Sequence, residues 1–153
     1  MAGDRDDRAR RSISLLAIRC RQVPGVRYET ATGKRPRDPD LSDTDHIDIF
    51  FDLNRNYSTY HRFSIDHRGW ASDAYGSDAS WNPKWYVAAQ TLDGAWTAEA
   101  AIPLTELNAT IVPGKTVWAI GIQRTVPGVG FQSWSAPASA TVIPEGFGWV
   151  MFE

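Results

Sequence analysis

Acidic and aromatic side chains alternate along one short stretch of this sequence, residues 43–53. Every second residue of an extended strand faces the same way, which groups one histidine, two acids and an aromatic residue: His46, Asp48, Phe50 and Asp52. An aromatic ring among hydrogen-bonding groups suits a polar ligand such as a sugar. A solvated outer strand face explains the same pattern equally well, and both interpretations stay open at this point.

A second alternating stretch, residues 59–66, follows the turn at residues 54–58 and brings a cation near these acids. If the two stretches form a hairpin centred near Asn56, Asp48 and Arg62 lie on the same face within reach of each other. The two side chains then form either a plain cross-strand ion pair or a charged pair that binds ligand hydroxyls.

Metal and cofactor chemistry is only weakly indicated. Oxygen ligands for calcium are present in and before the turn: Asp43, Asp45, Asp52, Asn54 and Asn56. Their spacing does not fit the EF-hand loop, and solvated turn acids are the commoner explanation. A haem needs axial histidine or methionine ligands, and Met151 is far along the chain from the three histidines. Calcium is therefore the one cofactor that the sequence suggests, and no metal-ligand set is assigned.

Motifs for nucleophilic catalysis or nucleotide binding are missing, since the sequence holds no Gly-x-Ser-x-Gly, Walker-type or Gly-x-Gly-x-x-Gly pattern. Several acids exist that could pair as in glycoside hydrolases, but the sequence does not place two of them across a sugar. We therefore expect a non-catalytic domain, either alone or as part of a larger enzyme.

Short β-strands must position these residues. The second face of the first stretch is apolar and specifies a strand on a core: Ile47, Ile49, Phe51 and Leu53. Further strands are predicted over residues 13–21, 59–66, 85–92, 95–102, 116–124, 131–135 and 147–152. About eight short strands without a long helix predict an all-β, antiparallel β-sandwich of immunoglobulin or jelly-roll type.

The connections carry clear signals of their own. Asp93-Gly94 between two β-runs is a strong hairpin turn, and residues 103–107 predict one short helical turn that begins at a proline. Residues 71–83 are predicted to form a loop. Residues 30–45 are predicted to form a long loop, either a functional rim or a flexible connector. Most tryptophans are expected to pack in the core: Trp81, Trp85, Trp96, Trp118 and Trp149.

Composition sets further bounds. The 153 residues suit one domain over residues 12–153, preceded by a charged arm over residues 1–11 that we expect to be disordered. Sixteen Lys and Arg against eighteen Asp and Glu give a net charge of −2, which argues against nucleic-acid binding through a basic surface. No apolar run reaches membrane-spanning length, so membrane insertion is not expected. A single cysteine, Cys20, excludes an intrachain disulfide.

Five motifs in this order resemble a known family. They are Asp45-x-Ile-Asp-Ile-Phe-Phe-Asp52 with Tyr60-x-x-Phe-x-Ile65, Trp96-Thr-Ala-Glu-Ala-Ala-Ile-Pro103 with Leu107, Trp118-x-Ile-x-Ile-Gln-Arg124, Ser133-Trp-Ser135, and Phe147-Gly148. Over residues 13–152 they resemble the family 9 carbohydrate-binding modules, in the wider DOMON-like group of β-sandwiches. The resemblance implies a non-catalytic module that holds a sugar, often a chain end, on a larger exported protein.

The resemblance also implies roles for particular residues. The family's acid falls on Asp48 and its glutamine on Gln123, with Arg124 beside it as a further candidate. The family's arginine falls on Ser64, so Arg62, two residues away on the same face, would substitute for it.

The family's sugar-clamping tryptophans have no counterpart here, because their places hold Ser42 and residues 141–142. Trp70, Tyr75 or Trp81 would have to supply a different aromatic platform.

Alternatives follow from these departures. A β-sandwich without sugar affinity could serve as a structural or interaction module, and a haem-binding DOMON-like domain is a third hypothesis. The family's strands before Leu15 are replaced by the charged arm, which suggests a truncated domain whose open sheet edge invites a homodimer. The resemblance implies an extracellular or periplasmic location, whereas the chain begins without a signal-peptide pattern, so the location stays open.

Overall fold

The computed structural model describes residues 13–135 and 137–153, and the arm predicted over residues 1–11 lies outside them. Nine β-strands and two short 3₁₀ turns occupy the described residues. The strands are β1 (Ile13–Arg21), β2 (His46–Asp52), β3 (His61–Asp66), β4 (Ala71–Tyr75), β5 (Tyr86–Leu92), β6 (Ala95–Pro103), β7 (Val117–Val126), β8 (Gly130–Ser133) and β9 (Gly148–Met151). The 3₁₀ turns are η1 (Leu104–Leu107) and η2 (Pro144–Gly146).

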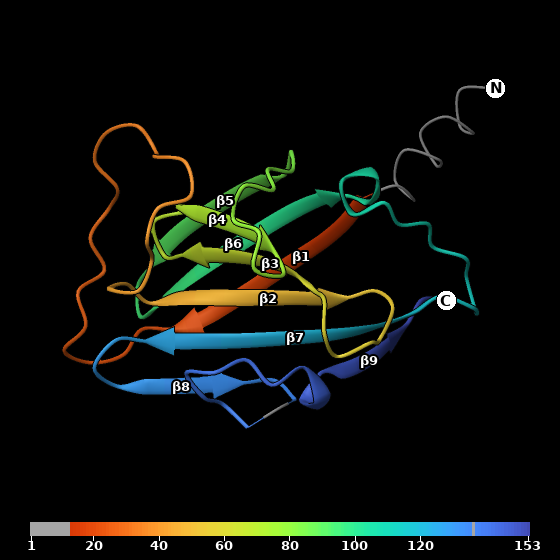
Figure 1. Cartoon of the computed structure of the whole chain (residues 1–153). Coiled ribbons are helices and arrows are strands. Elements are labelled where there is room, and N and C mark those ends of the chain that lie inside the picture. The colour runs from red at the N-terminus through yellow and green to blue at the C-terminus, as the bar shows by residue number, and fades with distance from the viewer. Residues whose placement is uncertain (1–12, 136) are drawn as a thin grey trace.

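Two antiparallel sheets build the domain. One has the order β1-β6-β5, and the other has the order β4-β3-β2-β7-β8, with β9 also paired to β7. The strands of the smaller sheet run obliquely across those of the larger one (Figure 1). The predicted all-β, antiparallel β-sandwich is therefore confirmed, and the helical turn predicted at residues 103–107 is present as η1.

The strand β2 lies in the middle of the larger sheet, between β3 and β7. Asp48 pairs with Ser64 and Phe51 with His61, so the β2–β3 hairpin is centred on Asn56, as predicted. The register puts alternate residues of β2 on the core face and on the outer face of the sheet. Every outer-face position of β2 is thereby aligned with defined positions on its two neighbours.

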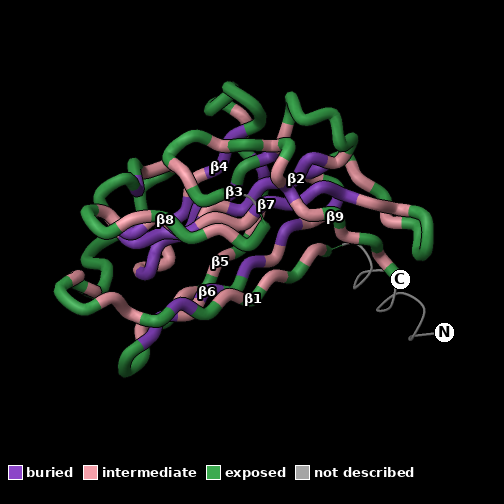
Figure 2. Tube along the Cα trace, turned by 90° about the horizontal axis from the view of Figure 1, so that it is seen from below, coloured by how far each residue is buried: buried purple, intermediate pink, exposed green. Residues whose placement is uncertain are grey.

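The core fills the space between the two sheets. Ile49, Phe63, Ile65, Trp96 and Ile102 have no exposed surface, and the apolar face predicted for β2 is part of this cluster. Figure 2 shows β2, β3 and β7 buried along most of their length, whereas the loops at both ends are exposed. The larger sheet is thus a rigid support for whatever its outer face carries.

Two predictions fail. Residues 71–75 form the strand β4 instead of a loop, because they add an edge to β3 with backbone hydrogen bonds. Trp149 is 63% exposed and not in the core, since it lies on β9 at the rim of the larger sheet. The strand predicted over residues 13–21 is present as β1, and Leu15 on it is 77% exposed because β1 covers the core with only one of its faces.

The edge of β1 is open within the described residues, where β6 is the only strand that pairs with it. A homodimer through this edge stays a prediction. Among residues 13–135 and 137–153, the short 3₁₀ turns are the only helical elements, and neither could cross a membrane.

Candidate functional site

A row of polar residues crosses the outer face of the larger sheet, at right angles to the strands. The pairing registers align one residue from each of five neighbouring strands. In order from β4 to β8 they are Ser72, Ser64, Asp48, Gln123 and Ser133. We call these five residues the polar row. Ser64 is buried and the other four are partly exposed, so the row holds hydroxyl, carboxylate and amide groups side by side on a rigid sheet.

Asp48 occupies the centre of the polar row and is held by two neighbours. The Ser64 hydroxyl donates a hydrogen bond to Asp48 Oδ1, and His46 Nε2 lies 3.5 Å from Asp48 Oδ2. Burial alone would raise the pKa of Asp48, but the contacts with His46 and Ser64 outweigh it and hold this pKa below its usual range. Asp48 is therefore an ionised hydrogen-bond acceptor at neutral pH.

His46 is the third member of the cluster around Asp48. It lies on the same face of the sheet, in the row next to the polar row. Its Nδ1 lies 2.7 Å from the carbonyl oxygen of Thr44. Burial works against its charged form, yet Asp48 and the Thr44 carbonyl raise the pKa of His46 above its usual value. The carboxylate stands between the hydroxyl and the imidazole, so the histidine does not contact Ser64 as the base of a nucleophilic triad would.

Arg62 and Trp70 flank the polar row on its two sides. Arg62 is exposed and pairs with Phe50. This pair is the next one on the same face after Asp48–Ser64, two residues further along β2. Trp70 precedes β4, and its carbonyl accepts a hydrogen bond from Asp66, which pairs with His46 in the next row. The Arg68 guanidinium stacks on the Trp70 ring at 3.9 Å.

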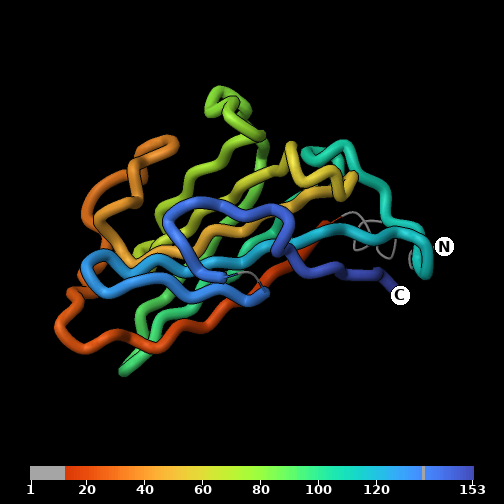
Figure 3. Tube along the Cα trace, turned by 60° about the horizontal axis from the view of Figure 1, so that its bottom comes forward, coloured from red at the N-terminus to blue at the C-terminus, as the bar shows by residue number. Residues whose placement is uncertain are grey.

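The described residues between β8 and β9, 134–135 and 137–147, form a segment that covers the Gln123 end of the polar row. Gln123 donates a hydrogen bond of 2.7 Å from its side-chain amide to the Ser139 carbonyl. Phe147 stacks on Phe50 with ring centroids 5.5 Å apart. Figure 3 shows this segment lying in front of β7 and β2. One predicted ligand-binding group is thus engaged by the protein's own backbone.

Gly121 is what allows this segment to approach the sheet. A methyl group at this position would lie 2.5 Å from the Phe147 ring and 3.1 Å from the Phe50 ring. We expect Gly121→Ala to lower the free energy of unfolding by about 1–3 kcal/mol through overpacking, measured by urea denaturation. In a Phe147→Ala background the same change should cost clearly less, because the closer of the two clashing rings is gone and only the 3.1 Å contact with Phe50 remains. An equal cost in both backgrounds would contradict this explanation.

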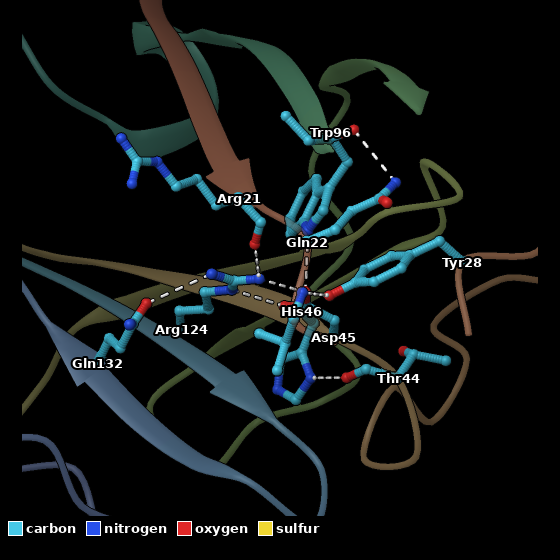
Figure 4. Close-up of polar contacts among 11 residues, drawn as sticks. Arg21, Gln22, Tyr28, Thr44, Asp45, His46, Trp96, Arg124 and Gln132 are labelled. Carbon is cyan, nitrogen blue, oxygen red and sulfur yellow. Dashed lines mark hydrogen bonds and ion pairs between the residues drawn. The ribbon is translucent and has the colours of Figure 1, made fainter. Parts of the chain in front are cut away.

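Arg124 lies on the opposite face of the same strand and points into the protein (Figure 4). Its Nε and Nη2 donate to Asp45 at 2.8 and 2.5 Å, and Nη2 also donates to the Arg21 carbonyl at 2.7 Å. Tyr28 and Trp96 donate to the same carboxylate at 2.8 and 3.0 Å. Arg124, the candidate beside Gln123, is therefore separated from the polar row by the sheet itself.

Trp81 lies at one end of the sandwich, away from the polar row. Its ring packs against His61 and Phe63, with ring centroids 5.0 and 5.6 Å apart. It lines a cavity of about 630 Å³, together with Tyr75 and residues of the loops that follow β2 and η1. The structure thus groups Asp48, Arg62 and Gln123, places Trp70 close by, and separates Arg124 and Trp81 from them.

Two features near the site are not evident from the sequence. Ser72 belongs to the row only because residues 71–75 form a strand. Trp149 pairs with Ala119 beside Asp52, and the Arg55 guanidinium lies 5.6 Å from its ring centroid. Alternation along β9 is the signal in the sequence that places Trp149 on the exposed face of that strand.

The suggested calcium ligands are partly committed to protein donors. Both oxygens of Asp45 accept the hydrogen bonds described above, and Asp52 accepts from the backbone amides of Asn56 and Tyr57 at 3.2 and 2.9 Å. Over residues 13–135 and 137–153, no three His, Cys, Asp or Glu side chains converge as a metal site requires.

Solved structures share this fold, among them two carbohydrate-binding modules. A family 9 carbohydrate-binding module from Caldicellulosiruptor kristjanssonii in complex with glucose matches with a TM-score of 0.57 and 15% identity, over 73% of this chain and 60% of that chain. A family 9 module from the same organism in complex with cellotriose matches with a TM-score of 0.57 and 14% identity, over 82% and 63%. No protein-family model and no curated protein matches the sequence.

The fold is therefore that of the family 9 carbohydrate-binding modules, as the five motifs indicate. The match covers less than two thirds of each solved chain. At this identity the likeness concerns the fold, and the ligand of this chain has to be argued from its own residues.

Proposed function

On the basis of this carbohydrate-binding-module fold, we propose that the domain is a non-catalytic module that binds a neutral saccharide across the polar row. The observation that carries the proposal is the alignment of Ser64, Asp48 and Gln123 across three adjacent strands. Glucose and cellotriose occupy the two solved modules of this fold. They are the first ligands to test.

The chemistry of the polar row suits sugar hydroxyls. The ionised Asp48 accepts hydrogen bonds, and charged acceptors make stronger hydrogen bonds than neutral ones. The exposed Arg62 supplies donors that ligand hydroxyls can meet from the solvent side. Rigid strands hold these groups in place, so little ordering is needed when a ligand binds.

The arrangement supports binding more than catalysis. His46 and Ser64 both contact Asp48, so the serine has no imidazole base. Gln123 and the hydroxyls beside it do not titrate near neutral pH. A ligand on this face would be held by hydrogen bonds and released unchanged.

A structural or interaction module is the second candidate, and one contact favours it. The bond from Gln123 to the Ser139 carbonyl removes a donor from the row, and two aromatic residues that line the same small hollow as Gln123, Phe50 and Phe147, are buried. A sugar would therefore bind mainly over the half of the row from Asp48 to Ser72, next to Arg62, unless residues 134–135 and 137–147 move aside.

Calorimetric titration of the folded protein with glucose and cello-oligosaccharides tests the proposal. We expect Asp48→Asn, which keeps the side-chain shape but removes its charge, to weaken binding about tenfold or more. Gln90→Ala, on the exposed face of β5 in the other sheet, is the matched control and should leave affinity unchanged. Absence of heat with every sugar, from protein shown to be folded, would instead favour the interaction module.

A further inference from the structure

A second hollow lies away from the polar row, where the long loop before β2 meets the edges of both sheets. It has a volume of about 450 Å³ and is bounded by residues 35–38, by Ala71 and Asp73 of β4, and by residues 82–86. This volume lies within the usual range of small-molecule sites. The loop over residues 30–45, predicted as either a rim or a connector, thus supplies one wall of a pocket.

The charge of this pocket is positive. Arg35, Arg37 and Lys84 line it, against the acids Asp38 and Asp73. Arg37 Nε donates to Asp38 Oδ2 at 3.1 Å, while Arg35 and Lys84 make no ion pair with any residue that the structure describes. Two cations are thus available for an anionic group that enters the pocket.

Asp73 is a buried acid in the wall of the pocket, and one of its oxygens has no hydrogen-bond partner among the described residues. The residue is only 7% exposed, and its Oδ2 accepts a hydrogen bond of 2.8 Å from the Trp85 indole. Its Oδ1 is shielded from water and has no hydrogen-bond partner among the described residues. Burial raises the pKa of Asp73, and the nearby Asp38 adds to this, whereas Trp85, Arg37 and Arg35 oppose it.

A buried carboxylate oxygen without a partner is energetically costly. A bound molecule that carries a hydrogen-bond donor would remove this cost. The pocket therefore matches a ligand that combines an anion for the cationic rim with a hydroxyl for the buried acid.

We propose that this pocket binds a hydroxylated carboxylate, of which a hexuronic acid is the sugar form. Arg35 and Lys84 hold the ligand carboxylate, and Asp73 accepts a ligand hydroxyl. This site shares no residue with the polar row, so either site can fail its test without affecting the other.

The Trp85 indole N–H is a built-in reporter, because it contacts Asp73 directly. Its NMR signal can be assigned by comparison with Trp85→Phe. We expect glucuronate to shift this signal in a saturable way, and glucose and acetate to leave it in place. An equal shift with acetate would reduce the pocket to a simple anion site and overturn the proposal. A shift with glucose alone, or none with millimolar glucuronate, would overturn it as well.

Substitutions locate the contacts. Arg35→Gln combined with Lys84→Gln should weaken glucuronate binding by about tenfold or more, with little effect on folding because both side chains are exposed. Arg27→Gln removes an exposed cation that lies outside the pocket lining and should not change affinity. Equal losses in both variants would indicate a general charge effect and contradict the assignment.

Discussion

Replacing Asp45 with alanine is expected to lower the free energy of unfolding by about 3–5 kcal/mol, because it leaves the buried Arg124 without its counter-charge. Asp45 is 1% exposed, and it accepts hydrogen bonds from the side chains of Arg124, Tyr28 and Trp96. Those donors join β7, the loop after β1, and β6 of the second sheet. Urea denaturation would measure the loss. Asp43→Ala, an exposed acid two residues earlier, should change stability by no more than about 0.5 kcal/mol.

The same cluster sets part of the acid stability of the protein. Burial alone would raise the pKa of Asp45, but hydrogen bonds from Arg124, Tyr28 and Trp96 outweigh it and lower this pKa. The stabilisation is therefore present above the unfolded-state pKa of about 4 and is lost as pH falls through the lower folded-state value. Asp45→Ala should flatten the loss of stability in this acidic window. An unchanged pH profile would show that the ion pair contributes nothing there.

Phe51→Ala is expected to cost about 3–5 kcal/mol, since it opens a cavity at the centre of the core. Phe51 is 1% exposed, and its ring lies 5.9 Å from that of Phe63 and 5.6 Å from that of Trp118. These neighbours belong to β3 and β7, which carry the row residues on either side of Asp48. The variant should also bind any ligand of the polar row more weakly under conditions where part of the protein unfolds.

Thermal and urea unfolding would both report this loss. Phe131→Ala removes the same side chain from an exposed position in β8 and should cost about 0.5 kcal/mol or less. If the two variants lose equal stability, the core between β2, β3 and β7 is less tightly packed than the ring contacts indicate.

Local periodicity in the sequence specifies most of this fold. Ile47, Ile49 and Phe51 identify the core face of β2, and the turn near Asn56 fixes the pairing of Asp48 with Ser64. The Asp93-Gly94 hairpin is likewise present, with Leu92 paired to Ala95. Each of these signals depends on residues close together in the chain, where turn geometry and alternation determine structure.

The candidate site depends more on pairings between distant segments. Ala71–Tyr75 contains Ser, Asp and Ala, which have weak β-propensity, and becomes a strand only because β3 offers an edge. Gln123 and Arg124 are adjacent in the sequence, but strand alternation sends them to opposite faces. The close contact of Phe147 with the sheet depends on the absence of a side chain at Gly121, which no local pattern reveals.

The inward-facing Arg124 also serves the outer face of the sheet. Because Arg124 on β7 is paired with Asp45 immediately before β2, β7 cannot slip by one residue without breaking a buried ion pair. Such a slip would turn Gln123 into the core and move it away from Asp48. The buried pair thus fixes the register of β7 against β2, and with it the positions of the residues on the outer face. Protein engineers could vary the residues of the polar row while the Arg124–Asp45 pair keeps the strands in register. The sheet is therefore a scaffold for selecting new binding specificities.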